Sequence, residues 1–336
     1  MKEYLQLGRL HTAPLETVPA IVGAALATGT LFHEAVLIWG LYGFLYHVAG
    51  YSHNSCTDYK LGGDVEDPNK QHHPLNDGRL EYSAAMGYVT FLMISLALYS
   101  MAAISYFQSG AVAVLLAVAI IIQIIFGVGY NLLNNVTDFK FIFITVSHTL
   151  VFLISYVASG GTFSWVFASL LVFVFLWVVF QISVSGEIKD IRVDESNFMI
   201  RMGTRVHEHT ALGDDRLYPS TGSIAWSAVI HVLMASALAP IVLNNSLTNT
   251  PQMVALCALY LVMVYLGSRV IDSGKYNRDK RVSNMALVEL LALSVFVLAA
   301  TPYIEQDLSV LLIPVSVAWV VVFNSIQWNT GVRPDV

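Results

Sequence analysis

Residues 110–130 read GAVAVLLAVAIIIQIIFGVGY, an apolar run without one charged side chain. A helix of about 20 such residues spans the hydrocarbon core of a bilayer. Nine other stretches are similar, so the candidate spans are 14–31, 35–53, 82–106, 110–130, 140–159, 163–185, 223–243, 252–271, 284–300 and 306–327. Since only 301–305 separates the last two, nine spans is an alternative. We predict an all-α, polytopic membrane helical bundle of nine or ten transmembrane helices.

The composition supports a membrane protein. Hydrophobic residues make up 56% of the 336 residues and charged residues only 12%, whereas about a quarter of a soluble domain is charged. The net charge of −6 is confined to loops, and we expect no nucleic-acid partner. The two cysteines, Cys56 and Cys257, provide no disulfide framework. Lys2 and Arg9 precede the first apolar run without a convincing cleavage site, so we expect a retained first helix.

The basic residues give an orientation. Under the ten-helix model all 17 Lys and Arg residues fall on one side, and the opposite loops carry none. The positive-inside rule makes that side the cytoplasm. We therefore predict an integral protein of the cell membrane with both termini in the cytoplasm.

Two long loops on this predicted cytoplasmic side contain acidic clusters. They cover 54–82 and 186–223 and follow the second and sixth spans. Long loops between packed elements are usually functional or disordered. Because ionisable groups at membrane helix ends are costly, they often mark function. Solvated loop charge is the alternative interpretation of either cluster alone.

The first cluster reads YSHNSCTDYKLGGDVEDPNK. Asn54 and Asp58 are four residues apart, which places them on one helical face. The pair Gly62-Gly63 permits a sharp turn that would bring Asp64 and Asp67 back toward them. Oxygen ligands of this kind suit Mg²⁺, which binds one or two carboxylates and completes its shell with water and substrate phosphate oxygens.

The second cluster reads SGEIKDIRVDES. Its spacing of three and then four residues aligns Glu187, Asp190 and Asp194 along one helical stripe. Two facing acidic stripes would hold two or three Mg²⁺ ions around a diphosphate. The predicted metal ligands are therefore Asp58, Asp64, Asp67, Glu187, Asp190 and Asp194.

These motifs resemble those of the UbiA superfamily of intramembrane prenyltransferases. The first reads Asn54-x-x-x-Asp58 followed by Gly62-x-Asp64, a form similar to the dihydroxynaphthoate prenyltransferases of menaquinone synthesis, and the second reads Asp190-x-x-x-Asp194. A stretch resembling N-K-x-x-R-P-L-x-x-G-R is matched at Asn69, Lys70, Pro74, Leu75, Gly78 and Arg79, with His73 in place of the usual Arg. The resemblance covers about two thirds of the chain and implies a single transmembrane prenyltransferase domain over 1–336.

The resemblance implies Mg²⁺-dependent transfer of a polyprenyl group from a prenyl diphosphate to an aromatic or quinone-precursor acceptor in the membrane. Asn54, Asp58, Asp190 and Asp194 would be the catalytic residues. Candidate diphosphate contacts are Asn54, Lys70, Lys189, Arg192 and Arg201. Candidate contacts of the acceptor or of an allylic carbocation are His53, Tyr51 and Tyr130, because aromatic faces attract cations.

Other functions are also compatible with the sequence. Within the superfamily, the acceptor could be a glycerophosphate ether or a carotenoid, or a terpene could be cyclised without an acceptor. A cation-coupled secondary transporter is an alternative of another class, although transporters favour charges near the midplane of the membrane. A non-catalytic scaffold would leave both acidic clusters unexplained.

Overall fold

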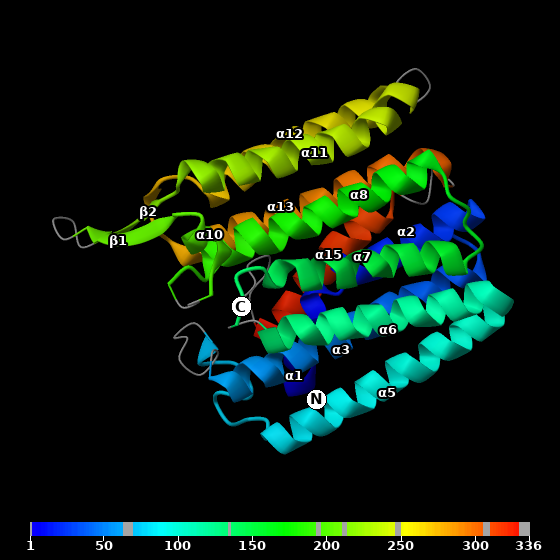
Figure 1. Cartoon of the computed structure of the whole chain (residues 1–336), viewed down its shortest axis with the longest axis horizontal. Coiled ribbons are helices and arrows are strands. Elements are labelled where there is room, and N and C mark those ends of the chain that lie inside the picture. The colour runs from blue at the N-terminus through cyan, green and yellow to red at the C-terminus, as the bar shows by residue number, and fades with distance from the viewer. Residues whose placement is uncertain are drawn as a thin grey trace. The chain divides into compact units, whose positions relative to one another are not determined.

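The computed structural model describes residues 2–62, 70–133, 136–192, 196–209, 214–245, 250–304 and 310–328. The helices of the first half are α1 (Lys2–Leu7), the 3-10 turn η1 (Leu10–Thr12), α2 (Pro14–Thr28), α3 (Glu34–Leu61), α5 (Tyr82–Phe107), α6 (Gly110–Leu133) and α7 (Lys140–Ala158). Those that follow are α8 (Trp165–Phe180), the π-helix η3 (Gln181–Gly186), α9 (Glu187–Lys189), α10 (Phe198–Arg201), α11 (Thr221–Asn245), α12 (Thr250–Val270), α13 (Arg278–Ala300), η4 (Thr301–Tyr303) and α15 (Leu312–Trp328). The strands are β1 (Arg205–His209), β2 (Asp214–Tyr218) and β3 (Gly274–Lys275) (Figure 1).

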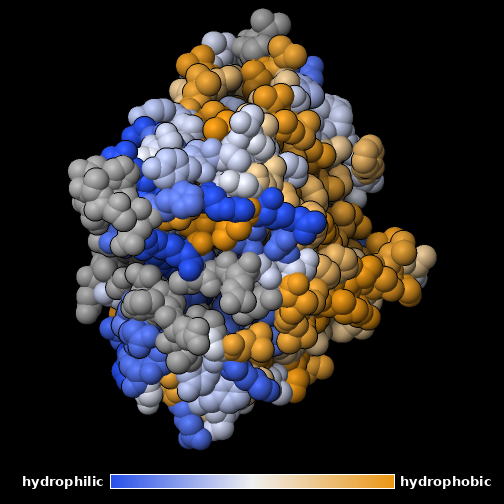
Figure 2. Space-filling view, turned by 60° about the vertical axis from the view of Figure 1, so that its left-hand side comes forward, coloured by the Kyte–Doolittle hydropathy of each residue, from blue (hydrophilic) through white to orange (hydrophobic). Residues whose placement is uncertain are grey.

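The all-α membrane prediction is confirmed. Within the described ranges, eight helices are long and apolar enough to cross a membrane. Two further predicted spans correspond to α3, which carries a polar end, and to the shorter α15. Large apolar side chains are exposed on many of these helices, among them Phe91, Leu115 and Val232. Figure 2 shows broad apolar areas on the face that it presents, as expected for a surface in contact with lipid.

Helix α3 is longer than the apolar pattern predicts. Its predicted span ends at residue 53, but the helix continues for two more turns to Leu61. Gly62 then ends it with φ 86° and donates its N–H to the carbonyl of Tyr59, a left-handed cap that glycine adopts without a Cβ penalty. The first predicted loop therefore begins at Gly62 and not at Asn54, because a helix can leave the apolar layer without ending.

The described chain forms two compact units. Unit 1 contains Met1–Leu132, Val146–Ser164 and Tyr303–Val336, and unit 2 contains Leu133–Thr145 and Trp165–Pro302. The single domain over 1–336 stays a prediction.

In unit 1, α2 packs closely against α3 and α7. A Cβ at Gly43 would lie 2.7 Å from the carbonyl oxygen of Glu16, and a Cβ at Gly23 would lie 2.3 Å from Oγ of Ser155. Small residues allow membrane helices to approach at such distances. At the other end of the chain, Gln6 Nε2 donates to the carbonyl of Gln327 at 2.7 Å. The C-terminal helix α15 thus pairs with the N-terminal segment.

In unit 2, α8 packs against α11 and α13, and α12 packs against α13. Phe173, Phe180 and Phe296 are buried in this core. The three short strands form an antiparallel sheet in the order β1-β2-β3, with Arg205 opposite Tyr218 and Leu217 opposite Gly274. The sequence analysis did not predict this sheet, which lies in the second long loop and in the segment after α12.

Candidate functional site

The first acidic motif lies on the last turns of α3 in unit 1. Asn54 and Asp58 are on consecutive turns of one helical face, as predicted, and Asp58 is buried at 8% exposure. Asp64 and Asp67 are outside the described residues. An amide and a buried carboxylate are oxygen donors of the kind that Mg²⁺ accepts. The described part of this motif therefore offers two oxygen ligands for Mg²⁺.

The predicted acceptor contacts lie beside this motif. His53 Nδ1 is 2.6 Å from the side-chain amide of Asn131 on α6, which follows the half-buried Tyr130. Tyr51 packs on the ring of His47 with centroids 4.4 Å apart, and the guanidinium of Arg9 lies 5.5 Å from the Tyr51 ring. His53 and Tyr51 are thus held by contacts within unit 1, and Tyr130 lies next to Asn131 in the chain.

The segment after the first motif is folded back onto the same unit. Leu75 and Leu80 pack with Leu7 of α1 and Cys56 of α3 in one apolar cluster. Arg79 donates to Oε1 of Gln6 at 3.2 Å and to the carbonyl of His72 at 2.7 Å. The main chain of Lys70, a predicted diphosphate contact, is held by a 2.7 Å hydrogen bond from Asn76 Nδ2 to its carbonyl. The stretch Lys70–Arg79 is therefore packed against α1 and α3.

In the second motif, Glu187 is almost fully buried in unit 2 at 2% exposure. Its Oε2 accepts the backbone N–H of Phe198 at 2.8 Å, and its Oε1 lies 3.6 Å from Nζ of Lys140. The side chain of Asn197 donates to the carbonyl of Glu187 at 2.7 Å. Glu187 thus fixes the segment after the helix to the helix end.

Asp190 lies one turn further on, where the helix has already ended. Its Oδ2 is 3.2 Å from Nζ of the neighbouring Lys189, and its Oδ1 accepts from Arg278 Nη2 at 3.2 Å. The π-helix η3 precedes this end, and π-bulges inside α-helices are frequent at functional sites. Glu187 and Asp190 therefore differ in burial and in partners, and Asp194 is outside the described residues.

Tyr276 contacts the end of the second motif in unit 2. The hydroxyl of Tyr276 donates to the carbonyl of Lys189 at 2.6 Å. The guanidinium groups of Arg192 and Arg281 each lie 5.5 Å from the centre of its ring. Burial, and next the nearby negative charge of Asp190, raise the pKa of Tyr276 to about 12. The tyrosine is therefore a neutral donor that fixes the backbone of the motif.

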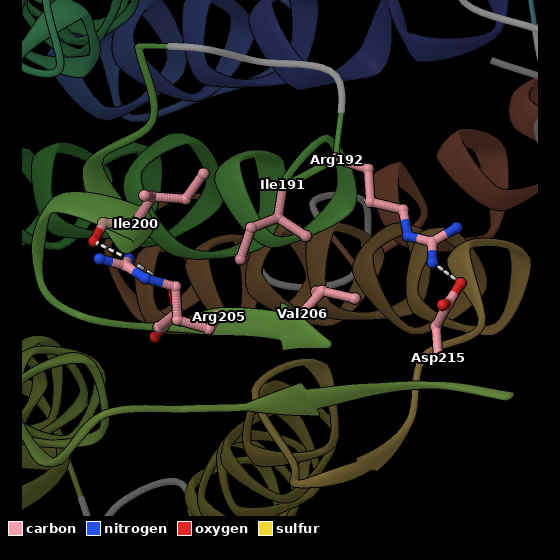
Figure 3. A pocket seen from close by; sticks show the side chains of 7 residues that line it. Ile191, Arg192, Ile200, Arg205, Val206 and Asp215 are labelled. Atoms are coloured by element: carbon pink, nitrogen blue, oxygen red, sulfur yellow. Dashed lines mark hydrogen bonds and ion pairs between the residues drawn. The ribbon is translucent and has the colours of Figure 1, made fainter. Parts of the chain in front are cut away.

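A pocket of about 600 Å³ adjoins the second motif in unit 2. Figure 3 shows Arg192 directed at Asp215, with which it forms an ion pair, and Arg205 turned back to the carbonyl of Ile200. The lining residues are Ile191, Arg192, Ile200, Thr204, Arg205, Val206 and Asp215. Both guanidinium groups are engaged with oxygen atoms of the protein, so an anion in this pocket would compete with those oxygens.

The last predicted diphosphate contact, Arg201, is exposed and paired. Its Nη1 lies 3.0 Å from Oδ2 of Asp138, and its guanidinium lies 5.1 Å from the centre of the Phe139 ring. It is held at the end of α10 by these two residues from the segment before α7.

The structure brings together some of the predicted residues and adds two that were missed. Within the described ranges, no three His, Cys, Asp or Glu side chains are placed to share a metal ion. Sequence reasoning missed Tyr276 and Arg278. The only signal was the basic cluster between α12 and α13, which was interpreted as positive-inside charge.

Comparison with known proteins decides the family. A sequence model of the UbiA prenyltransferase family matches residues 17–288, most of the chain. The chain belongs to the UbiA prenyltransferase family. The predicted membership of the UbiA superfamily is thereby confirmed, and so is the prediction of a membrane prenyltransferase. A search of curated protein sequences found no match.

Solved UbiA structures share the fold at low sequence identity. An apo UbiA homologue from Aeropyrum pernix K1 is 16% identical, with a TM-score of 0.61 over 87% of this chain and 96% of that one. A UbiA homologue from Archaeoglobus fulgidus, solved bound to GPP and Mg²⁺, is 14% identical, with a TM-score of 0.59 over 89% and 99%. A digeranylgeranylglyceryl phosphate synthase is 15% identical, with a TM-score of 0.56 over 90% and 98%.

Proposed function

We propose that this UbiA family member transfers a prenyl group from a prenyl diphosphate to a small aromatic or quinone-precursor acceptor dissolved in the membrane, with Mg²⁺ as cofactor. The observation that carries the proposal is family membership combined with an acidic motif at the polar end of two helices, Asp58 on α3 and Asp190 after α9. Structural neighbours from Archaeoglobus fulgidus were solved with GPP or DMAPP together with Mg²⁺.

Each motif has a proposed role. Asn54, Asp58 and Asp190 bind Mg²⁺ and its diphosphate. Asp64, Asp67 and Asp194 complete the ligand set, and Glu187 is a further candidate whose oxygens would have to leave Phe198 and Lys140. Bound Mg²⁺ would neutralise the diphosphate and stabilise charge on the leaving group. Lys70, Lys189, Arg192 and Arg201 bind diphosphate oxygens as charge-assisted donors.

Arg278 joins this set because it already contacts Asp190. Its planar guanidinium can bind two diphosphate oxygens at once, which a lysine cannot do. Tyr51 and Tyr130 offer aromatic faces to the allylic cation, and His53 offers a hydrogen bond to the acceptor. The positive-inside charge supports a cytoplasmic position of both termini.

A glycerophosphate acceptor is the second candidate. The fold likeness to a digeranylgeranylglyceryl phosphate synthase favours it, whereas the Gly62-x-Asp64 form of the first motif favours the aromatic acceptor. The two acceptors differ in that one carries a phosphate, so they separate in a direct assay.

The test uses the purified full chain in lipid nanodiscs with geranylgeranyl diphosphate. Diphosphate release and prenylated product are measured with 1,4-dihydroxy-2-naphthoate or with geranylgeranylglyceryl phosphate as acceptor. We expect release to need Mg²⁺, to be abolished by EDTA, and to fall at least about 100-fold in Asp58→Asn and in Asp190→Asn. The matched control is Asp272→Asn, an exposed aspartate paired with Arg269.

The outcomes separate the alternatives. Product with the naphthoate supports the proposal, and product with the glyceryl phosphate alone supports the second candidate. Diphosphate release without any acceptor would indicate cyclisation or hydrolysis. If folded protein releases no diphosphate and shows cation-dependent flux in proteoliposomes, the protein is a transporter and not a prenyltransferase.

A further inference from the structure

A charged cluster lies inside unit 1, away from both acidic motifs. Glu16 of α2 is 1% exposed. Its Oε2 contacts Nδ1 of His47 on α3, and its Oε1 lies 2.7 Å from Nδ1 of His148 on α7. We call these three residues the Glu16 cluster. Burying a carboxylate among apolar helices is costly unless it is paired, so the two imidazoles stabilise the ionised form of Glu16.

Both ring nitrogens of His47 have oxygen neighbours. Nδ1 contacts the Glu16 carboxylate, and Nε2 lies 3.1 Å from the carbonyl oxygen of Arg9 and 3.3 Å from Oγ1 of Thr12. Thr12 Oγ1 also donates to the carbonyl of Arg9 at 2.9 Å. His47 is thus held between Glu16 and the backbone of the N-terminal segment.

The backbone of Arg9 supports this arrangement. With φ 44°, Arg9 is the single non-glycine residue with a positive φ in the described part of the chain. Such a conformation is strained and persists only where the surroundings impose it. Here it accompanies the contact of the Arg9 carbonyl with His47.

His148 lies on the other side of the carboxylate, with Nδ1 2.7 Å from Oε1 of Glu16. Its second ring nitrogen, Nε2, points away from Glu16. No described residue hydrogen-bonds Nε2, and the side chain is 14% exposed. Tyr46 is a further titratable neighbour, whose ring meets His148 edge-on at 5.8 Å and whose hydroxyl is paired with Ser147 Oγ at 2.6 Å. A carboxylate at one nitrogen and an open position at the other is the arrangement of a general base.

Gly50 lies on α3 between this cluster and the first motif. His47, Gly50 and Asn54 follow one another at helical spacing, and a Cβ at Gly50 would meet no atom within 4 Å. At 1.5 Å per residue, His47 lies about 10 Å from Asn54 along the helix axis. The cluster thus lies deeper along the apolar part of α3 than the residues proposed to bind diphosphate.

We propose that His148 is the catalytic base that accepts the proton of the prenyl acceptor, and that Glu16 and His47 position it. The inference rests on the proposed function and specifies the acceptor as a molecule with an ionisable hydroxyl group. The acceptor O–H proton passes to His148 Nε2. The acceptor oxygen, or a ring carbon conjugated with it, forms a bond to C1 of the prenyl chain. The C1–O bond breaks, and its electron pair leaves on the diphosphate.

The experiment separates the proton transfer from diphosphate binding. Variants His148→Gln and His148→Ala of the full chain are compared with wild type in nanodiscs. Affinity for geranylgeranyl thiolodiphosphate with Mg²⁺ is measured by calorimetry, and turnover is measured with geranylgeranyl diphosphate and 1,4-dihydroxy-2-naphthoate or geranylgeranylglyceryl phosphate. His231→Gln is the matched control, a buried histidine of α11 in unit 2 whose ring nitrogens have no hydrogen-bond partner among the described residues.

We expect unchanged thiolodiphosphate affinity, turnover lowered about 100-fold in both His148 variants, and partial recovery of His148→Ala by added imidazole. We also expect lower turnover in Glu16→Gln, and turnover between that of Glu16→Gln and wild type in Glu16→Asp. The melting temperature of each variant is the folding control. Turnover that is retained in the His148 variants overturns this inference alone. Loss of turnover together with loss of thiolodiphosphate affinity, and no recovery with imidazole, assigns a structural role and also overturns it. An inactive, folded wild type overturns the proposed function first.

Discussion

Arg278 Nη2 lies 3.2 Å from Oδ1 of Asp190, although the two residues are 88 positions apart in the chain. This contact joins the segment after α12 to the end of the second acidic motif within unit 2. A guanidinium that already faces the motif carboxylate is placed to bind a diphosphate held by that motif.

The first prediction concerns this arginine. Arg278→Gln should raise KM for geranylgeranyl diphosphate by about tenfold, since a hydrogen bond to a charged group contributes roughly 1.5–3 kcal/mol. KM for the naphthoate acceptor should stay constant, because Arg278 contacts Asp190 of the proposed diphosphate site and is not among the proposed acceptor contacts. Steady-state kinetics at saturating Mg²⁺ measure both constants.

The control for this prediction is Arg269→Gln, which removes an exposed arginine paired with Asp272 at 2.6 Å. It should leave both KM values within about twofold, because exposed ion pairs contribute little. An equal rise of the diphosphate KM in both variants would mean that general positive charge, and not Arg278, attracts the substrate.

The second prediction concerns Glu187 and Lys140, whose charged atoms lie 3.6 Å apart in the interior of unit 2. Removing one partner takes the opposite charge away from a buried ion, so Glu187→Gln and Lys140→Met should each destabilise the protein by about 3–5 kcal/mol. The double variant should cost less than the sum of the two. Denaturation in mild detergent gives the free energies for this double-mutant cycle.

The same variants address the proposed metal role of Glu187. If Glu187 only fixes Phe198 and Lys140, the Mg²⁺ concentration for half-maximal activity stays the same in folded Glu187→Gln. A rise of tenfold or more in that concentration would make Glu187 a metal ligand, in line with the sequence prediction.

Much of the helical architecture could be predicted, because membrane-spanning helices are recognised from the length and apolar composition of a continuous stretch of sequence. The helical pairing of Asn54 and Asp58 followed from their spacing. Residues such as Glu16 and Arg278 could not be found in this way. Glu16 is one acid in an apolar run, and its meaning comes from His47 and His148 on two distant helices. The short sheet was missed because β1 and β2 lie in a polar loop without an apolar pattern and their partner β3 is far away in sequence.

The third prediction concerns pH and Tyr276. Burial, followed by the charge of Asp190, raises its pKa to about 12, whereas an unfolded tyrosine titrates near 10. Below about pH 10 both states keep the proton, so the contribution of Tyr276 to stability is fully present. From about pH 10 to 12 the unfolded state loses its proton first, and stability falls.

Tyr276→Phe removes this titration. The free energy of unfolding should therefore fall less steeply with pH in Tyr276→Phe than in wild type between about pH 10 and 12, while the two slopes agree from pH 7 to 9. Denaturant unfolding in detergent at each pH gives the slopes. Parallel slopes above pH 10 would show that Tyr276 loses its proton at the same pH in both states.

The fourth prediction concerns the space beside Gly50. A leucine there would project into a region in which no atom lies within 4 Å of the position that its Cβ would take, between the Glu16 cluster and Asn54. If the acceptor occupies this region, Gly50→Leu raises the acceptor KM at least about tenfold and leaves the affinity for geranylgeranyl thiolodiphosphate unchanged. Gly87→Leu on α5 is the matched control, because a Cβ at that exposed glycine also meets no atom within 4 Å. A fall in thiolodiphosphate affinity with an unaltered acceptor KM would instead assign the space to the prenyl chain.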